Sequence, residues 1–157
     1  DTSSQDGSVT ITDNIATFTP NADFNGVASF TYLVTDGELA SESSTVSITV
    51  NAVNDAPELT AIQDQSIDED AVLSLTLSAS DVDGDDLIYS ASIDGNGSVD
   101  IADTDLTLTP DQNYNGSITV SVSVTDGEYI DSQDFVLTVN AVNDAPVSES
   151  VSSPLCV

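Results

Sequence analysis

A letter-for-letter duplication of eight residues is the feature that most constrains this chain. The sequence Val-Asn-Ala-Val-Asn-Asp-Ala-Pro occupies residues 50–57 and returns at residues 139–146. The match continues upstream, because Thr-Asp-Gly-Glu at residues 35–38 returns at residues 125–128. Internal repeats of this kind are characteristic of modular proteins. The chain is therefore predicted to consist of modules of about 90 residues, a length that suits a β-sandwich.

Apolar and polar residues alternate along much of both copies. Apolar residues occupy every second position over residues 28–34, 73–79 and 118–124. A period of two is typical of half-buried strands, and no segment keeps a helical period. About seven short strands per complete module, separated by Asp-Gly and Asn-Gly turns, predict an all-β fold of tandem Greek-key sandwiches with immunoglobulin-like architecture.

The two copies differ in length on their N-terminal sides. Only residues 1–6 precede Gly7, whereas residues 58–96 precede its counterpart Gly97. The expected domains are residues 1–56 as the C-terminal part of a repeat that lacks its first strands, residues 57–146 as a complete repeat, and residues 147–157 as a tail, the start of a next repeat or a donor strand. Two explanations for the missing strands stay open: the sequence is a window cut from a longer array, or another chain supplies them.

The charge balance is extreme. The chain carries 28 Asp and Glu residues and no Lys, Arg or His, which gives a formal net charge of −28. Its side chains cannot form salt bridges with one another, so each carboxylate needs water, a backbone N–H or an external cation. Binding to nucleic acid or to an anionic membrane surface is not expected, and no apolar run is long enough for membrane insertion. The acidic residues indicate either cation binding or a solvated surface suited to high salt.

The residue types of most catalytic sites are missing. Without His, Lys or Arg, the chain cannot build a catalytic triad, a Schiff base or a cationic oxyanion site. Two carboxylates could hydrolyse a glycoside, but the acids lie in predicted turns and there is no Trp to stack on a sugar. We therefore do not expect an enzyme.

Two further features concern modification and cross-linking. Asn96 and Asn115 each begin an Asn-Gly-Ser sequence, the acceptor pattern for N-glycosylation in cells that use that pathway. Cys156 is the only cysteine, so no disulfide can form within the chain. It either joins two chains or has no role in the tail. A Ser- and Thr-rich composition without Lys or disulfides favours a secreted bacterial or archaeal protein.

Four motifs together resemble those of a known family. They are Asn-Asp-Ala-Pro at the end of each copy, Glu-Asp at residues 69–70, Asp-x-Asp-Gly-Asp at residues 81–85, and Thr-Asp-Gly in the late turn. In this combination, and over nearly the whole chain, they resemble the cadherin-like repeats of large bacterial surface and biofilm proteins. The resemblance implies a β-sandwich, a secreted or cell-surface location, and Ca²⁺ held at module junctions so that a tandem array becomes rigid.

The acidic motifs also suit calcium by their own chemistry. Calcium takes about six to eight oxygen ligands from carboxylates, amides, backbone carbonyls and water. If the acidic turn and the late turn lie where the linker enters the second module, one site has the expected ligands Asn54, Asp55, Asp81, Asp83 and Asp126. A second site is expected at the opposite end, with the ligands Glu69, Asp70, Asn143 and Asp144, to which Asp111 and Asn113 add. Asp85 is expected to be a solvated neighbour.

Three functions are compatible with the sequence. The first is an extracellular structural or adhesive module, rigidified by calcium, in a cell-surface stalk or fibre. The second is a subunit of a secreted filament assembled by strand donation between chains. The third is an accessory binding module of a secreted polysaccharide-degrading enzyme. The expected partners are neighbouring repeats or copies of the chain itself in a fibre, with a cell-surface or glycan ligand.

Overall fold

The computed structural model describes residues 3–4 and 6–145, and these residues form only strands and loops. The prediction of an all-β fold is confirmed. The chain divides into two compact units, Asp1–Asp55 and Ala56–Val157, and the division falls inside the first octapeptide. No part of the described chain forms a helix that could cross a membrane. The expected tail or donor strand at residues 147–157, with Cys156, lies outside the described residues.

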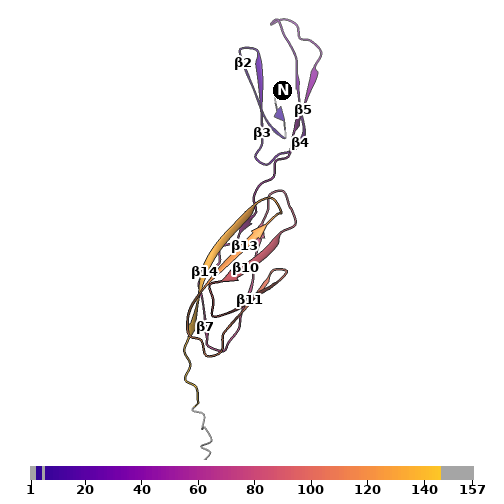
Figure 1. The fold of residues 1–157 in the computed structure, drawn as a ribbon. Coiled ribbons are helices and arrows are strands. Elements are labelled where there is room, and N and C mark those ends of the chain that lie inside the picture. The colour runs from indigo at the N-terminus through magenta and orange to yellow at the C-terminus, as the bar shows by residue number, and fades with distance from the viewer. Residues whose placement is uncertain (1–2, 5, 146–157) are drawn as a thin grey trace, which may run out of the picture. The chain divides into compact units, whose positions relative to one another are not determined.

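Unit 1 contains two small antiparallel sheets (Figure 1). Their strands are β1 (Ser3–Ser4), β2 (Gly7–Thr12) and β3 (Ile15–Pro20) in one sheet, and β4 (Gly26–Tyr32) and β5 (Ser44–Val50) in the other. A two-residue turn joins β2 to β3, with Asp13 at φ 49° and Asn14 at φ 65°. Asp and Asn tolerate this left-handed conformation better than other non-glycine residues, which explains the tight hairpin.

Unit 2 is a sandwich of two larger sheets (Figure 1). The first sheet has the order β10 (Ile88–Ile93), β13 (Gly116–Thr125), β14 (Ile130–Asn140) and β7 (Gln65–Asp68), and the second has the order β11 (Gly97–Ala102), β12 (Asp105–Pro110) and β8 (Leu73–Thr76). A short pair joins β6 (Glu58–Leu59) to β9 (Ala79–Ser80). The chain changes sheets between β10 and β11 and again between β12 and β13, as Greek-key sandwiches do.

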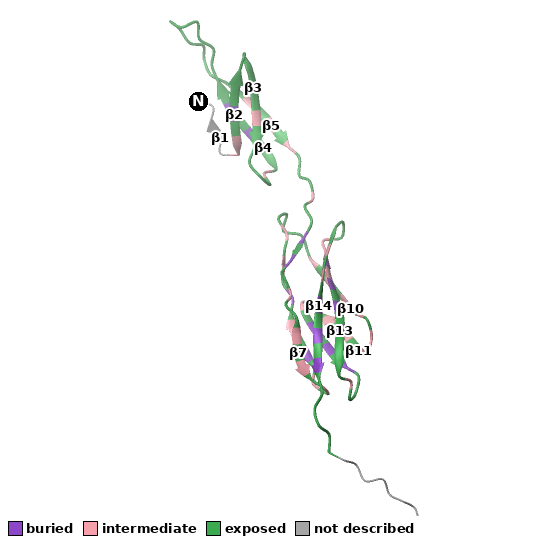
Figure 2. Cartoon of the chain, turned by 90° about the vertical axis from the view of Figure 1, so that its left-hand side faces the viewer, coloured by how far each residue is buried: buried purple, intermediate pink, exposed green. Residues whose placement is uncertain are grey.

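The core of unit 2 follows the alternation of its strands. The inward residues of β13 and β14 are at most 3% exposed: Ile118, Val120, Val122, Val124, Phe135, Leu137 and Val139. Leu106 and Leu108 of β12 are fully buried against them from the other sheet. Figure 2 shows this pattern as alternating buried and exposed segments along the two long strands. Burial of these side chains is the main stabilising term of the unit.

The two copies share their strand register. In the hairpin of β4 and β5, Gly26 faces Val50, and in the hairpin of β13 and β14, Gly116 faces Val139. Gly97, the counterpart of Gly7, lies so close to β12 that a Cβ on it would be 2.6 Å from the carbonyl oxygen of Thr109. Such a contact is too short for any side chain, which explains why glycine opens this strand.

One predicted strand is divided between two sheets. The alternation over residues 73–79 predicts a single strand, but β8 pairs with β12 and β9 pairs with β6. At the break, the Leu77 N–H donates to the carbonyl oxygen of Thr104 at 2.7 Å, and the Ser78 carbonyl accepts from the N–H of Thr60 at 2.9 Å. Leu77 lies in the same core as Leu73, so the alternation of apolar residues continues across the break although the strand does not.

Candidate metal centre

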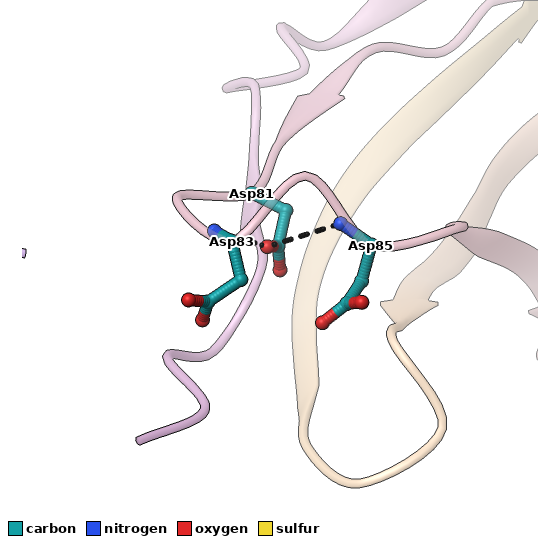
Figure 3. Close-up of side chains that lie close together, drawn as sticks. All are labelled: Asp81, Asp83 and Asp85. Atoms are coloured by element: carbon teal, nitrogen blue, oxygen red, sulfur yellow. Dashed lines mark hydrogen bonds between the residues drawn. The ribbon is translucent and has the colours of Figure 1, made fainter. Parts of the chain in front are cut away.

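Three carboxylates lie together in the loop between β9 and β10. Asp81 follows β9 directly, and the ligand oxygens of Asp81, Asp83 and Asp85 lie within 4.8 Å of one another (Figure 3). Two oxygens on opposite sides of a calcium ion are about 4.6–5.2 Å apart, so the spacing suits a shared ion. Among the residues that the structure describes, this is the one group of three or more acidic, His or Cys side chains with such spacing.

The loop is folded around the side chain of Asp81. The Oδ1 atom accepts hydrogen bonds from the backbone N–H groups of Asp83 at 2.8 Å, Gly84 at 3.1 Å and Asp85 at 3.5 Å. Gly84 has φ 78°, a left-handed conformation that glycine adopts without a steric penalty. These bonds turn the chain so that the carboxylates of positions 81, 83 and 85 face one region, as Figure 3 shows.

The second carboxylate oxygen of Asp81 is buried without compensation. Among the described residues, Oδ2 of Asp81 has no hydrogen-bond partner and almost no contact with solvent. A buried polar atom without a partner is unfavourable, and it is more so for a charged group. A cation beside Oδ2 would remove this penalty, so the geometry of Asp81 fits a metal ligand.

The electrostatics of the loop also favour a cation. The pKa of Asp85 is raised from its ordinary value, first by desolvation in the loop and then by repulsion from the carboxylates of Asp81, Asp83, Asp126 and Asp86. The contribution of Asp126 indicates that the turn between β13 and β14 lies near this loop. Asp126 is held in place because its Oδ1 accepts from the N–H groups of Glu128 at 2.7 Å and Tyr129 at 2.6 Å.

Asp85 is exposed, as a solvated neighbour would be, and its carboxylate lies close to those of Asp81 and Asp83. This grouping adds Asp85 to the candidate ligands. The left-handed Gly84 folds the loop so that Asp85 turns back towards Asp81.

The linker residues of the predicted site belong to unit 1. Asn54 is half-buried and Asp55 is exposed, and both precede the division between the units. Their role as ligands stays a prediction.

At the opposite end of unit 2, the expected ligands make separate hydrogen bonds. Glu69 is bonded to the segment after β14, since its Oε1 accepts from the N–H of Val142 at 2.5 Å. Asp70 meets Asn113, whose N–H donates to Oδ1 of Asp70 at 3.0 Å. The side chain of Asn143 donates to the carbonyl oxygen of Asp144 at 3.3 Å. An ion shared by Glu69, Asp70, Asn143 and Asp144 stays a prediction.

The two glycosylation patterns lie in accessible loops. Asn96 is exposed with φ 62° in the turn before β11, and Asn115 is exposed directly before β13. Both positions are open to an enzyme, and their modification stays a prediction.

Several solved structures are partly similar to the chain. The chain is 20% identical to an endo-fucoidan hydrolase of glycoside hydrolase family 107, over 90% of this chain and 23% of that one, with a TM-score of 0.45. It is 16% identical to titin domains Z1Z2 in complex with telethonin, over 88% of this chain and 74% of that one (TM-score 0.45), and 15% identical to the insect immune protein hemolin, over 75% and 29% (TM-score 0.42). The chain thus spans about a quarter of the hydrolase that it resembles.

Comparison with sequences points to one family. No curated protein sequence matches the chain. The family model of the cadherin-like domain matches residues 1–51 and again residues 53–140, which together cover most of the chain and both units. The chain therefore belongs to the cadherin-like domain family.

Proposed function

We propose that this chain is an extracellular structural or adhesive module of a surface stalk or fibre, stiffened by Ca²⁺ that binds to the loop between β9 and β10. The observation that carries the proposal is Oδ2 of Asp81, which is buried without a partner inside a cluster of three carboxylates. The chain has no cationic side chain, so a cation that compensates this atom must come from outside the chain.

Asp81 is the central ligand of the proposed site. Its Oδ1 holds the loop through backbone N–H groups, which leaves Oδ2 for the ion. Asp83 and Asp85 supply oxygens from the same loop, and Asp126 is a further candidate from the late turn. A bound divalent cation would offset the repulsion that raises the pKa of Asp85. It would also join two loops that the chain itself cannot link by an ion pair.

The ligand roles of Asn54 and Asp55 are a part of the proposal that rests on the sequence. Asparagine and aspartate oxygens are suitable calcium ligands, and these two residues directly precede unit 2. If they bind the same ion as Asp81, calcium stiffens the linker as well as the loop. Calorimetry on the Asp55→Ala variant would then give weaker calcium binding than the parent chain.

The extracellular location rests on the family. Cadherin-like domains are typically extracellular and serve adhesion or mechanical support, and both units match that family. The proposed setting is a tandem array of such domains on a bacterial surface or in a biofilm fibre, with neighbouring repeats as partners. The accessory-module hypothesis has less support. A depression of about 330 Å³ on the outer face of β10, β13 and β14 is lined by Ser, Ala, Val and Asp134, without an aromatic side chain to stack on a sugar.

Thermal unfolding with millimolar Ca²⁺ and with excess chelator tests the proposal. A ligand that binds only the folded state stabilises it by about 2.7 kcal/mol at a concentration of 100 times its Kd. We expect a clear upward shift of Tm with calcium in the parent chain and a much smaller one in Asp81→Asn. Asp100→Asn is the matched control, because Asp100 is exposed on β11 and its substitution removes the same charge. Identical melts with calcium and with chelator would refute the calcium site.

A further inference from the structure

The chain contains three Asn-Gly dipeptides, at residues 25–26, 96–97 and 115–116. All three asparagines are exposed. The second and the third dipeptide are each followed by serine, so Asn96 and Asn115 begin identical tripeptides. A difference in the reactivity of these two asparagines therefore reflects mainly their surroundings in the fold.

An asparagine that precedes a glycine can lose its side-chain amide. The backbone nitrogen of the glycine attacks the side-chain carbonyl carbon, its proton leaves with the amide nitrogen as ammonia, and a succinimide ring closes. Water then opens the ring at either carbonyl, which gives aspartate or isoaspartate. Glycine favours the reaction because it has no Cβ to obstruct the approach, and asparagine is accordingly a thermolabile residue.

The nitrogen of Gly97 points away from the strand with which β11 pairs. Gly97 faces Pro110 in the register of β11 and β12, and the carbonyl oxygen of Asn96 accepts from the N–H of Asp111 at 2.9 Å. Hydrogen-bonded and non-hydrogen-bonded pairs alternate in an antiparallel ladder, so Gly97 and Pro110 form a non-hydrogen-bonded pair. Because β11 is the outer strand of its sheet, the N–H of Gly97 faces the open edge.

The nitrogen of Gly116 belongs to a ladder instead. The N–H of Thr119 donates to Oδ1 of Asp94 at 3.0 Å, so it points from β13 towards β10. N–H groups alternate in direction along a strand, and Gly116 lies an odd number of positions earlier, so its N–H points towards Val139 on β14. The side chain of Tyr114 also covers Gly116, since its hydroxyl would lie 2.7 Å from a Cβ there.

Gly26 has the same place in unit 1. It faces Val50 in the hairpin of β4 and β5, as Gly116 faces Val139 in the hairpin of β13 and β14. Of the three glycine nitrogens, that of Gly97 is therefore the one directed away from a ladder.

We propose that Asn96 is a site of spontaneous deamidation in the folded chain, where the edge-facing nitrogen of Gly97 closes the ring and water completes the conversion to aspartate and isoaspartate. The fold retains the reactive dipeptide, because a Cβ at Gly97 would lie 2.6 Å from the carbonyl oxygen of Thr109. Loss of the amide also removes the acceptor for N-glycosylation, so the two modifications of Asn96 exclude one another.

The product places two carboxylates opposite each other. Asn96 and Asp111 occupy one cross-strand pair, and the equivalent pair of unit 1 is Asp6 and Asn21. The same backbone bond joins it, since the N–H of Asn21 donates to the carbonyl oxygen of Asp6 at 3.0 Å. Each unit thus carries one carboxylate and one amide at this pair, in opposite order. Deamidation gives unit 2 two carboxylates there, and like charges directly opposite are destabilising.

Peptide mapping after incubation in oxygen-labelled water tests the proposal. The full-length chain is kept in mildly alkaline buffer with excess chelator and is then digested with pepsin in acid, because it has no Lys or Arg for trypsin. Each conversion during the incubation brings in a labelled oxygen atom, and electron-transfer fragmentation separates aspartate from isoaspartate. We expect Asn96 to convert at least about threefold faster than Asn115, since the N–H of Gly116 must first leave its hydrogen bond.

The unfolded chain is the matched control. In concentrated urea, Asn96 and Asn115 should convert at similar rates, because the same tripeptide surrounds them and the ladders are gone. Equal rates in the folded chain, or faster conversion of Asn25 or Asn115, would overturn the proposal. So would an Asn96 that reacts in urea and stays unchanged in the folded chain.

The cost of the product is tested with variants in excess chelator. Asn96→Asp should lower Tm, whereas Asn115→Asp adds the same charge outside the pair and should lower it less. Adding Asp111→Asn to Asn96→Asp gives the order found in unit 1 and should restore Tm. Equal effects of the two single variants, or no recovery in the double variant, would refute repulsion within the pair. All of these measurements are made without calcium, so their failure leaves the calcium proposal intact.

Discussion

The Asp131 carboxylate on β14 accepts a hydrogen bond of 2.8 Å from the backbone N–H of Leu59, which lies 72 positions earlier in the chain. Gln133 on the same strand donates from Nε2 to the carbonyl oxygen of Leu59 at 2.6 Å and accepts from the N–H of Ile62 at 3.3 Å. Side chains, not a backbone ladder, therefore hold β6 and the residues that follow it against this part of β14. These bonds attach the start of unit 2 to the part of β14 that β7 does not pair with.

Removal of the Asp131 carboxylate should loosen this closure. Asp131→Ala leaves the N–H of Leu59 without an acceptor in a part-buried position, and we expect a loss of about 1–3 kcal/mol in the free energy of unfolding of unit 2. Native-state hydrogen exchange at Leu106, in the core of unit 2, measures the change. Asp134→Ala removes the same charge from an exposed position of β14 and is the control. Equal effects of the two substitutions would contradict a structural role for the bond.

The close approach of β11 and β12 should make Gly97 intolerant of a side chain. A Cβ at this position would lie 2.6 Å from the Thr109 carbonyl oxygen and 3.0 Å from Cα of Pro110, so Gly97→Ala must displace backbone. We expect a loss of about 1–3 kcal/mol, as for an overpacked core, measured by urea denaturation. Ser98→Ala, at the next and exposed position, should change stability by less than about 0.5 kcal/mol.

The carboxyl group of Asp36, in the late turn of unit 1, should titrate with a pKa below its ordinary value. Backbone N–H groups of Leu39 and Glu38 donate to Asp36 and lower its pKa from the ordinary value of 3.8. A carboxyl group with a lowered pKa in the folded state contributes stability above its unfolded pKa and loses it as pH falls through the folded pKa. Carbon-detected NMR titration of the Asp36 carboxyl should therefore give a midpoint below 3.8. A midpoint at or above this value would show that the turn does not hold the charged form.

Substitution of Asp85 should have opposite effects with and without calcium. The raised pKa of Asp85 means that the folded state binds more protons than the unfolded state above the ordinary value of 3.8, so without calcium stability falls as pH rises through the folded pKa. At neutral pH, Asp85→Asn should therefore raise Tm in excess chelator, because it removes a charge that its neighbours repel.

In saturating calcium, the same substitution should lower Tm, because a charged ligand is lost. Thermal melts of the parent chain and of Asp85→Asn, in excess chelator and in saturating calcium, measure the direction of each change in Tm. Asp100 lies outside the cluster, so Asp100→Asn should change Tm in the same direction with calcium and with chelator. If Asp85→Asn changes Tm in the same direction in both conditions, Asp85 is not a calcium ligand.

The turns and hairpins follow from local sequence. Thr125 and Asp126 make the same bonds as Thr35 and Asp36: the threonine Oγ1 accepts from the glycine N–H at 3.0 Å in both copies. These bonds join residues two or three positions apart, so a short motif contains all of their partners. The alternation over residues 118–124 likewise predicts β13, because period and burial agree there.

The sequence did not predict strands β6 and β7 or the grouping of the carboxylates in the acidic loop, which only the tertiary structure shows. The strands β6 and β7 are too short and too polar for a pattern of their own, and they form because β9 and β14 offer them partners. Asp85 joins Asp81 and Asp83 through the left-handed turn at Gly84, which spacing alone did not reveal.

The sequence by itself determined which side chains face inward, because side-chain direction in a strand depends only on the period of two. Tyr32 and Val122 are equivalent in that respect, yet one is 45% exposed and the other 0% exposed. Burial depends on which strands surround a side chain, and in unit 2 these include strands distant in the sequence, such as β10 beside β13. Only the tertiary structure decided which of the two identical patterns became a closed core.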